Sequence, residues 1–109
     1  MGQNLTDEAL ELVATRFRIL GEPMRLKILQ ELKAAEKNVT ELIEACGATQ
    51  ANVSRHLGVL LQAGMVYRRR DGVNAYYGIQ DETIFRLCSV ACDALKKDVN
   101  NRTKALVGR

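Results

Sequence analysis

The segment from residue 45 to residue 70 constrains the fold of this chain more than any other. It contains four arginines and no acidic residue. Its first half has the pattern of a short polar helix that begins at Thr49, after Cys46-Gly47-Ala48, and its second half ends in a basic run before Asp71-Gly72. Short helices joined by a tight glycine-containing turn are typical of a helix-turn-helix, and Asp-Gly between strand-like segments predicts a hairpin. This order predicts one helix placed in a DNA groove with a hairpin beside it.

Helical patterns flank this segment on both sides. Thr6 is a good N-cap for a first helix, and Pro23 can open a second because its missing N–H does no harm there. Asn38 and Glu41 have the spacing of a capping box at the start of a third helix. The chain therefore predicts one mainly α domain with a small β-hairpin, in the order helix-helix-helix-helix-hairpin-helix. Within residues 1–109, the predicted parts are a helix over 6–20, a helix-turn-helix over 39–63, a wing hairpin over 65–79, a helix over 81–99, and a basic tail over 100–109 that we expect to fray.

Composition and charge narrow the class of protein. The length of 109 residues fits one domain. Three cysteines without a signal-peptide pattern predict reduced thiols in the cytoplasm, and no apolar run approaches the roughly 18 residues of a membrane span. A single histidine and the lack of a phosphate-binding glycine-rich loop argue against an enzyme. The net charge is +4 over residues 45–70 and −3 over residues 71–95. This segregation is expected if one face binds a polyanion, although a solvated basic face would give the same pattern.

Four passages resemble the ArsR/SmtB-type winged helix-turn-helix repressors, and the resemblance covers nearly the whole chain. The passages are Leu20–Leu29, similar to the turn into the family's second helix; Val39–Leu42, similar to the start of its third; Thr49–Leu57, similar to its recognition helix; and Gly64–Gly72 with Tyr76-Tyr77, similar to its wing. The resemblance implies a homodimeric repressor whose first and last helices, 6–20 and 81–99, form the dimer interface. Such a dimer would bind double-stranded DNA at an imperfect palindrome.

The outward face of the helix that follows Thr49 is the predicted reader of base sequence. Gln50 and Asn52 can pair with adenine, and Arg55 can reach guanine or a phosphate. Ser54 and His56 match positions that contact DNA in the resembling family, and we favour a DNA contact for His56 over a solvated helix histidine. The predicted DNA-contacting set in this helix is Thr49, Gln50, Ala51, Asn52, Ser54, Arg55 and His56.

The basic run Arg68-Arg69-Arg70 adds a second predicted DNA contact, from the wing. Side chains alternate along a strand, so Arg68 and Arg70 should point away from Arg69. We expect at least one of the three to reach a phosphate or the minor groove. The competing interpretation is an edge strand that charge keeps from aggregating.

Two thiols four residues apart, Cys88 and Cys92, are the candidate sensing residues. They share one side of the last predicted helix with Cβ atoms about 5–6 Å apart. As thiolates they could bind a thiophilic metal or metalloid ion, and no other cofactor is required. The chain lacks the paired cysteines near the third helix and the histidine-rich last helix of the resembling family's best-known metal sites. The alternative is that Cys88 packs as a small apolar residue, as we expect for Cys46 at the turn.

Together these features predict a sequence-specific DNA-binding regulator. The favoured interpretation is a homodimeric repressor released from its operator by a metalloid, a metal ion, or an oxidant or sulfur species that acts on thiols. Two alternatives stay open: a repressor with no small inducer, and a winged-helix module for protein–protein interaction. The acid-free segment over residues 45–70 argues against the interaction module.

Overall fold

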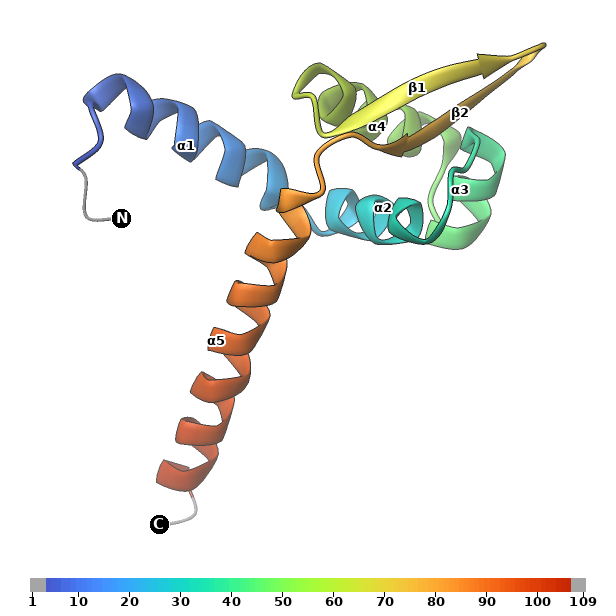
Figure 1. Ribbon diagram of the computed structural model, residues 1–109. Coiled ribbons are helices and arrows are strands. Elements are labelled where there is room, and N and C mark those ends of the chain that lie inside the picture. Colours follow the sequence, from blue (N-terminus) through green and yellow to red (C-terminus); the bar gives the residue numbers. More distant parts are fainter. Residues whose placement is uncertain (1–3, 107–109) are drawn as a thin grey trace.

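The computed structural model describes residues 4–106, with side chains described to residue 102. Within this range, five helices and one antiparallel hairpin follow one another in the predicted order (Figure 1). The elements are α1 (Asp7–Leu20), α2 (Pro23–Ala34), α3 (Val39–Cys46), α4 (Gln50–Gln62), β1 (Val66–Asp71), β2 (Asn74–Ile79) and α5 (Thr83–Leu106).

Local capping explains where the first four helices begin. The Thr6 hydroxyl accepts from the Ala9 N–H at 3.1 Å, and the Thr49 hydroxyl accepts from the Asn52 N–H at 3.2 Å. Asn38 and Glu41 form the predicted capping box at the start of α3. The carboxylate of Glu22 caps α2, where Pro23 occupies the first turn. Each cap satisfies backbone donors that the first turn of a helix leaves unpaired.

The core lies between α2, α3, α4 and the base of the hairpin, which form one compact head in Figure 1. Buried aliphatic side chains fill it. Of the buried side chains in the described range, α1 contributes Leu20 and α5 contributes Ile84, with Ile19 and Phe85 packed against them while partly buried. The fully buried side chains are Ile28, Leu29, Leu42, Val53, Leu57, Leu60, Met65, Val66 and Ile84. A core of this kind fixes α4 against α2 and α3 and leaves the opposite face of α4 in solvent.

The hairpin is the predicted wing. Its strands pair from Val66 opposite Ile79 to Asp71 opposite Asn74. Gly72 has a φ of +64°, which suits the first position of a two-residue hairpin turn, where glycine is favoured. The loop after α2 also pairs with the hairpin, because Lys37 and Tyr77 exchange two backbone hydrogen bonds of 2.8 and 3.1 Å. These bonds tie the base of the wing to the helical head.

The last helix differs from the expectation at both ends. It starts at Thr83 rather than at residue 81, with Asp81 accepting hydrogen bonds from the Thr83 N–H and hydroxyl. It continues to Leu106, so residues 100–106 of the expected tail are helical in this structure, and residues 107–109 lie outside the described range. No glycine or proline interrupts residues 83–106. An ion pair four residues apart, Arg102 to Asp98 at 3.3 Å, also supports the helix.

The helices α1 and α5 extend away from the head in different directions (Figure 1). Both carry large apolar side chains in solvent, among them Leu12, Phe17, Val90 and Leu95, with Val90 70% exposed and Leu95 64% exposed. None of the described helices is both apolar enough and long enough to span a membrane. Contiguous exposed apolar surface of this kind marks an interaction site.

Candidate DNA-binding surface

The turn between α3 and α4 sets the direction of the recognition helix. Gly47 ends α3 with a left-handed φ of +64°, and its N–H donates to the Ile43 carbonyl at 2.9 Å. A residue with a side chain would be strained in this conformation. Two residues later Thr49 caps α4. The turn therefore presents the N-terminal end of α4, the end that reads base edges in helix-turn-helix proteins.

Most of the predicted reading residues lie in solvent on α4. The structure brings five of them together on one exposed face, next to the exposed cap Thr49. The Arg55 guanidinium lies 3.5 Å from Asn52 Oδ1, so these two side chains are adjacent on that face. The exposed set is Gln50, Ala51, Asn52, Ser54 and Arg55.

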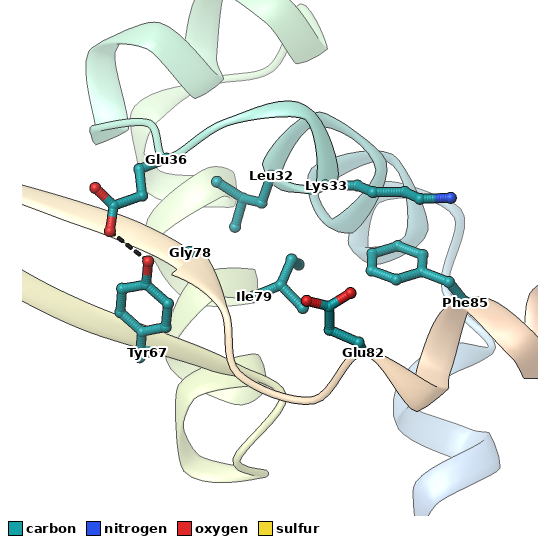
Figure 2. A pocket seen from close by; sticks show the side chains of 8 residues that line it. All are labelled: Leu32, Lys33, Glu36, Tyr67, Gly78, Ile79, Glu82 and Phe85. Carbon is teal, nitrogen blue, oxygen red and sulfur yellow. Dashed lines mark hydrogen bonds between the residues drawn. The ribbon is translucent and has the colours of Figure 1, made fainter.

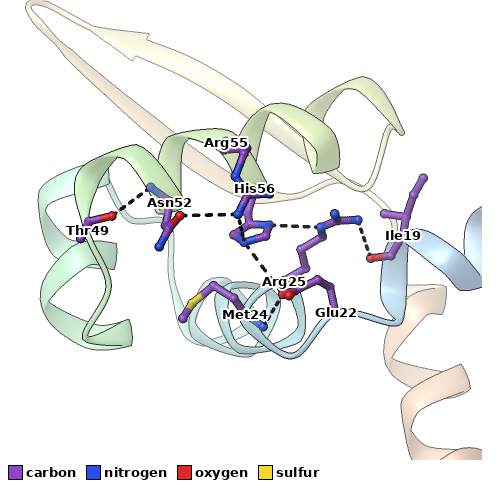
Figure 3. Close-up of polar contacts among 8 residues, drawn as sticks. All are labelled: Ile19, Glu22, Met24, Arg25, Thr49, Asn52, Arg55 and His56. Carbon is purple, nitrogen blue, oxygen red and sulfur yellow. Dashed lines mark hydrogen bonds and ion pairs between the residues drawn. The ribbon is translucent and has the colours of Figure 1, made fainter.

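His56 does not belong to that face, so its predicted outward position is wrong. The residue is only 3% exposed, and its Nδ1 accepts from Arg25 Nε at 3.2 Å (Figure 3). Burial, followed by the neighbouring Arg55 guanidinium, holds the pKa of His56 below its usual value. Helical spacing could have revealed this, because position 56 follows Val53 by three residues and precedes Leu60 by four. A direct contact between this imidazole and DNA is therefore unfavourable in the described conformation.

The three wing arginines divide into two kinds. Arg69 binds Glu36 through three hydrogen bonds of 2.7, 3.1 and 3.3 Å and lies over the ring of Tyr76 at 5.1 Å. Arg68 and Arg70 are exposed and, among the described residues, have no ion-pair partner. The alternation along β1 thus leaves these two arginines available for DNA, while Arg69 anchors the wing to the head.

The anchor of the wing includes a residue that sequence reasoning missed. Glu36 accepts a hydrogen bond from the Tyr67 hydroxyl (Figure 2). It also accepts hydrogen bonds from Arg69. The bond from Arg69, followed by that from Tyr67, lowers the pKa of Glu36 and keeps it ionised. Thirty-three residues separate Glu36 from Arg69 along the chain, so no local signal marks the pair.

The cysteines occupy two different environments. Cys46 is 3% exposed in the core, and burial raises the pKa of its thiol, so the prediction that it packs is confirmed. Cys88 is half-buried and Cys92 is exposed on α5. Both line an open apolar hollow of about 360 Å³, whose other walls are Phe17, Leu20, Gly21, Leu26, Leu87, Ala91 and Leu95.

This hollow by itself does not complete a metal site. In the described part of the chain, no group of three or more His, Cys, Asp or Glu side chains converges on one point. Two thiolates suit a soft ion, but a trivalent metalloid needs a third donor. The pair therefore fits such an ion only if another protomer or an external ligand supplies that donor.

A family model, a sequence relative and a solved structure all relate the chain to bacterial transcriptional regulators. The family model described as "Bacterial regulatory protein, arsR family" matches residues 22–68. The HTH-type transcriptional regulator Rv0081 of Mycobacterium tuberculosis is 36% identical over 97 residues, covering 88% of this chain and 85% of that protein. Its crystal structure covers 90% of this chain and 99% of its own, with 34% identity and a TM-score of 0.80.

Two further relatives have names that state an oligomeric state or a type of resistance. The homodimeric winged helix-turn-helix DNA-binding domain Mb0332 of Mycobacterium bovis, solved by NMR, is 28% identical with a TM-score of 0.74, covering 93% of this chain and 95% of its own. The arsenical resistance operon repressor of Bacillus subtilis is 34% identical over 83 residues, covering 75% of this chain and 79% of that protein.

These relatives are named as transcriptional regulators or repressors, which confirms the prediction of a regulator rather than an enzyme. The likeness to solved winged helix-turn-helix structures confirms the predicted fold. The sequence identity extends over most of the chain, and the family model covers the helix-turn-helix and the first part of the wing. The chain belongs to the ArsR family of DNA-binding transcriptional regulators.

Proposed function

We propose that the protein is a homodimeric repressor in which α4 of each protomer reads the major groove of a specific operator. The observation that carries this proposal is the division of α4 into two faces. Val53, Leu57 and Leu60 hold one face in the core, while Gln50, Asn52, Ser54 and Arg55 stand in solvent beside the helix N-terminus. Amide and guanidinium groups in that position can make paired hydrogen bonds to adenine and guanine.

The wing contributes affinity rather than base reading. Arg68 and Arg70 are unpaired among the described residues and lie on the hairpin next to α4, so each can neutralise a DNA phosphate. Phosphate contacts fix the position of a protein on the duplex without specifying sequence. Arg69 is the wing arginine that we least expect to contact DNA, because Glu36 already binds it.

A second copy of the chain covers the apolar faces of α1 and α5 in this proposal. Phe17, Val90 and Leu95 would otherwise remain in water, at a cost of about 25 cal/mol per Å² of apolar surface. The Mycobacterium bovis relative of similar fold is homodimeric. Two reading helices about one DNA turn apart would require an imperfect palindrome.

The signal that releases the repressor acts on Cys88 and Cys92 in this proposal. Both thiols line the hollow between α1, α2 and α5, so a bound soft ion or an oxidised thiol would disturb the packing of the dimer helices. A disulfide between residues four apart in an intact helix is strained, so oxidation would distort α5. The Bacillus subtilis relative is named for arsenical resistance, which supports a thiophilic signal.

Binding to the promoter of its own operon tests the DNA-reading role. The double variant Ser54→Ala, Arg55→Ala should weaken operator binding by about 1–3 kcal/mol per lost base contact, measured by fluorescence anisotropy with excess nonspecific DNA. The matched control is Lys27→Ala, Gln30→Ala, which removes one positive and one polar side chain from exposed positions of α2. Wild-type affinity in the Ser54, Arg55 variant would overturn the assignment of α4. A wild-type protein without affinity for any DNA would favour a protein–protein interaction module.

A further inference from the structure

Arg25 connects α1 to the middle of α4, whereas Arg16 of α1 reaches only the C-terminal cap of α4, at the Ala63 carbonyl. Arg25 Nε donates to His56 Nδ1 at 3.2 Å, inside α4, and Arg25 Nη1 donates to the Ile19 carbonyl at 3.1 Å, in the last turn of α1 (Figure 3). The Ile19 carbonyl is one of the four acceptors that a helix C-terminus leaves without a partner. A single planar guanidinium thus spans the corner between α1 and α2 and reaches the recognition helix.

The contact with Arg25 assigns the proton of neutral His56. Arginine can only donate, so in the tautomer in which Nδ1 accepts from Arg25 the ring carries its proton on Nε2. Nε2 lies 3.9 Å from Glu22 Oε1 and 3.3 Å from an Arg55 nitrogen. In this tautomer Nε2 is a donor and Arg55 can only donate, so their contact is a hydrogen bond only in the other tautomer. Glu22, Arg25 and Arg55 are the charged groups that face the ring.

The contact between Arg25 and His56 lies between the proposed reading face of α4 and the hollow that contains the thiols. His56 immediately follows Arg55 and lies one helical turn after Asn52, so a displacement of the helix backbone at His56 would also move those two exposed side chains. The hollow that contains Cys88 and Cys92 lies near the same corner, because its lining includes Leu20, Gly21 and Leu26. The corner that Arg25 holds is therefore shared by the reading helix and the thiol hollow.

We propose that Arg25 and His56 are positioning residues for DNA recognition, and that their contact sets how α4 presents Asn52 and Arg55 to the bases. The proposal rests on the reading role of α4 proposed above. It predicts a loss of sequence preference, rather than of general DNA affinity, when the contact is broken. It also predicts acid sensitivity, because protonation of Nδ1 turns the acceptor that Arg25 Nε has among the described residues into a donor.

The first test compares Arg25→Met with Lys27→Met, which removes a positive charge from an exposed position on the same helix. The quantity measured is the ratio of operator affinity to nonspecific DNA affinity at constant ionic strength. Arg25→Met should lower this ratio about tenfold, the loss expected when one base contact is misplaced. Lys27→Met should leave the ratio unchanged. Arg25→Lys keeps the charge but offers no planar pair of donors, so it should also lose sequence preference if Arg25→Met fails to fold.

The second test uses His56 and pH. His56→Asn keeps an acceptor near the position of Nδ1 without a titrating group, and His56→Leu removes the acceptor. As the pH is lowered from 8, the wild-type ratio should fall only below the usual histidine pKa, because burial lowers the pKa of His56. The ratio should stay level for His56→Asn and be low throughout for His56→Leu and Arg25→Met.

A wild-type ratio in Arg25→Met, or equal losses of operator and nonspecific affinity, would overturn the positioning role. A wild-type ratio in His56→Leu would overturn the role of the His56 acceptor. If the wild-type protein showed no preference for operator over nonspecific DNA at pH 8, the reading role of α4 would be overturned. The positioning role of Arg25 and His56 would then fall as well.

Discussion

Tyr67 lies directly across the hairpin from Gly78, and its phenol ring occupies the space that a Cβ on residue 78 would need (Figure 2). An added Cβ would overlap Cζ and the hydroxyl oxygen of Tyr67 and lie 2.7 Å from Cε2. Because residue 78 is glycine, the ring can cross the neighbouring strand and its hydroxyl can reach Glu36. Glycine inside a strand often marks a close approach of this kind.

Gly78→Ala should therefore loosen the wing. The methyl group forces the Tyr67 ring away from Glu36, and overpacking of this kind costs about 1–3 kcal/mol of the free energy of unfolding. Urea denaturation measures the change. The matched control is Gly58→Ala in α4, where an added Cβ meets nothing within 4 Å and should stabilise the helix by about 0.5–1 kcal/mol. A neutral effect of Gly78→Ala would mean that the ring can rotate away freely.

The wing arginines should differ in their contribution to DNA binding. Arg68→Ala and Arg70→Ala should each weaken binding to all sequences alike and lower the slope of log affinity against log salt by about 1. Arg69→Ala should leave that slope nearly unchanged, because Glu36 holds this side chain away from phosphate. Affinities measured across a salt series distinguish the three variants. If Arg69→Ala lowered the slope by about 1 as well, Arg69 must leave Glu36 and contact a phosphate when the protein binds DNA.

The oligomeric state should depend on α1 and α5. A buried charge at an apolar interface is costly, so Leu95→Glu should convert a dimer into a monomer and weaken operator binding. Sedimentation equilibrium measures the molecular mass. Val73→Glu adds the same charge at the tip of the wing, where the valine is 94% exposed, and should remain dimeric. A dimeric Leu95→Glu variant would place the interface elsewhere.

Thiol chemistry should release the protein from DNA only while α5 carries its cysteines. The variant Cys88→Ser, Cys92→Ser should bind operator as the wild type does. It should also resist release by As(III), Cd(II), Zn(II), peroxide or polysulfide, added in turn to the DNA complex. Cys46→Ala is the control, because its thiol is buried in the core and should not react. Normal release of the double serine variant would exclude the pair, and a wild-type complex that survives every reagent would indicate a repressor without a thiol signal.

Local signals predicted the order of elements because each acts within a few residues. Thr49 and Asn38 cap helices through donors three residues ahead, and Gly47 ends α3 through its own left-handed backbone. The end of α5 was harder to predict, since a polar and basic composition suits a frayed tail and an exposed helix equally well. The helix persists to Leu106, with the Asp98–Arg102 pair in its later turns.

The sequence by itself determined a winged helix-turn-helix with a polar outward face on α4, because caps, glycine turns and apolar periodicity are properties of neighbouring residues. Only the tertiary structure decided which candidate side chains are available to DNA. His56 is buried and accepts a hydrogen bond from Arg25, 31 residues away in the sequence. Arg69 is bound by Glu36, 33 residues away. Such pairs depend on the positions that packed helices and strands take in space, and no pattern along the chain carries that information.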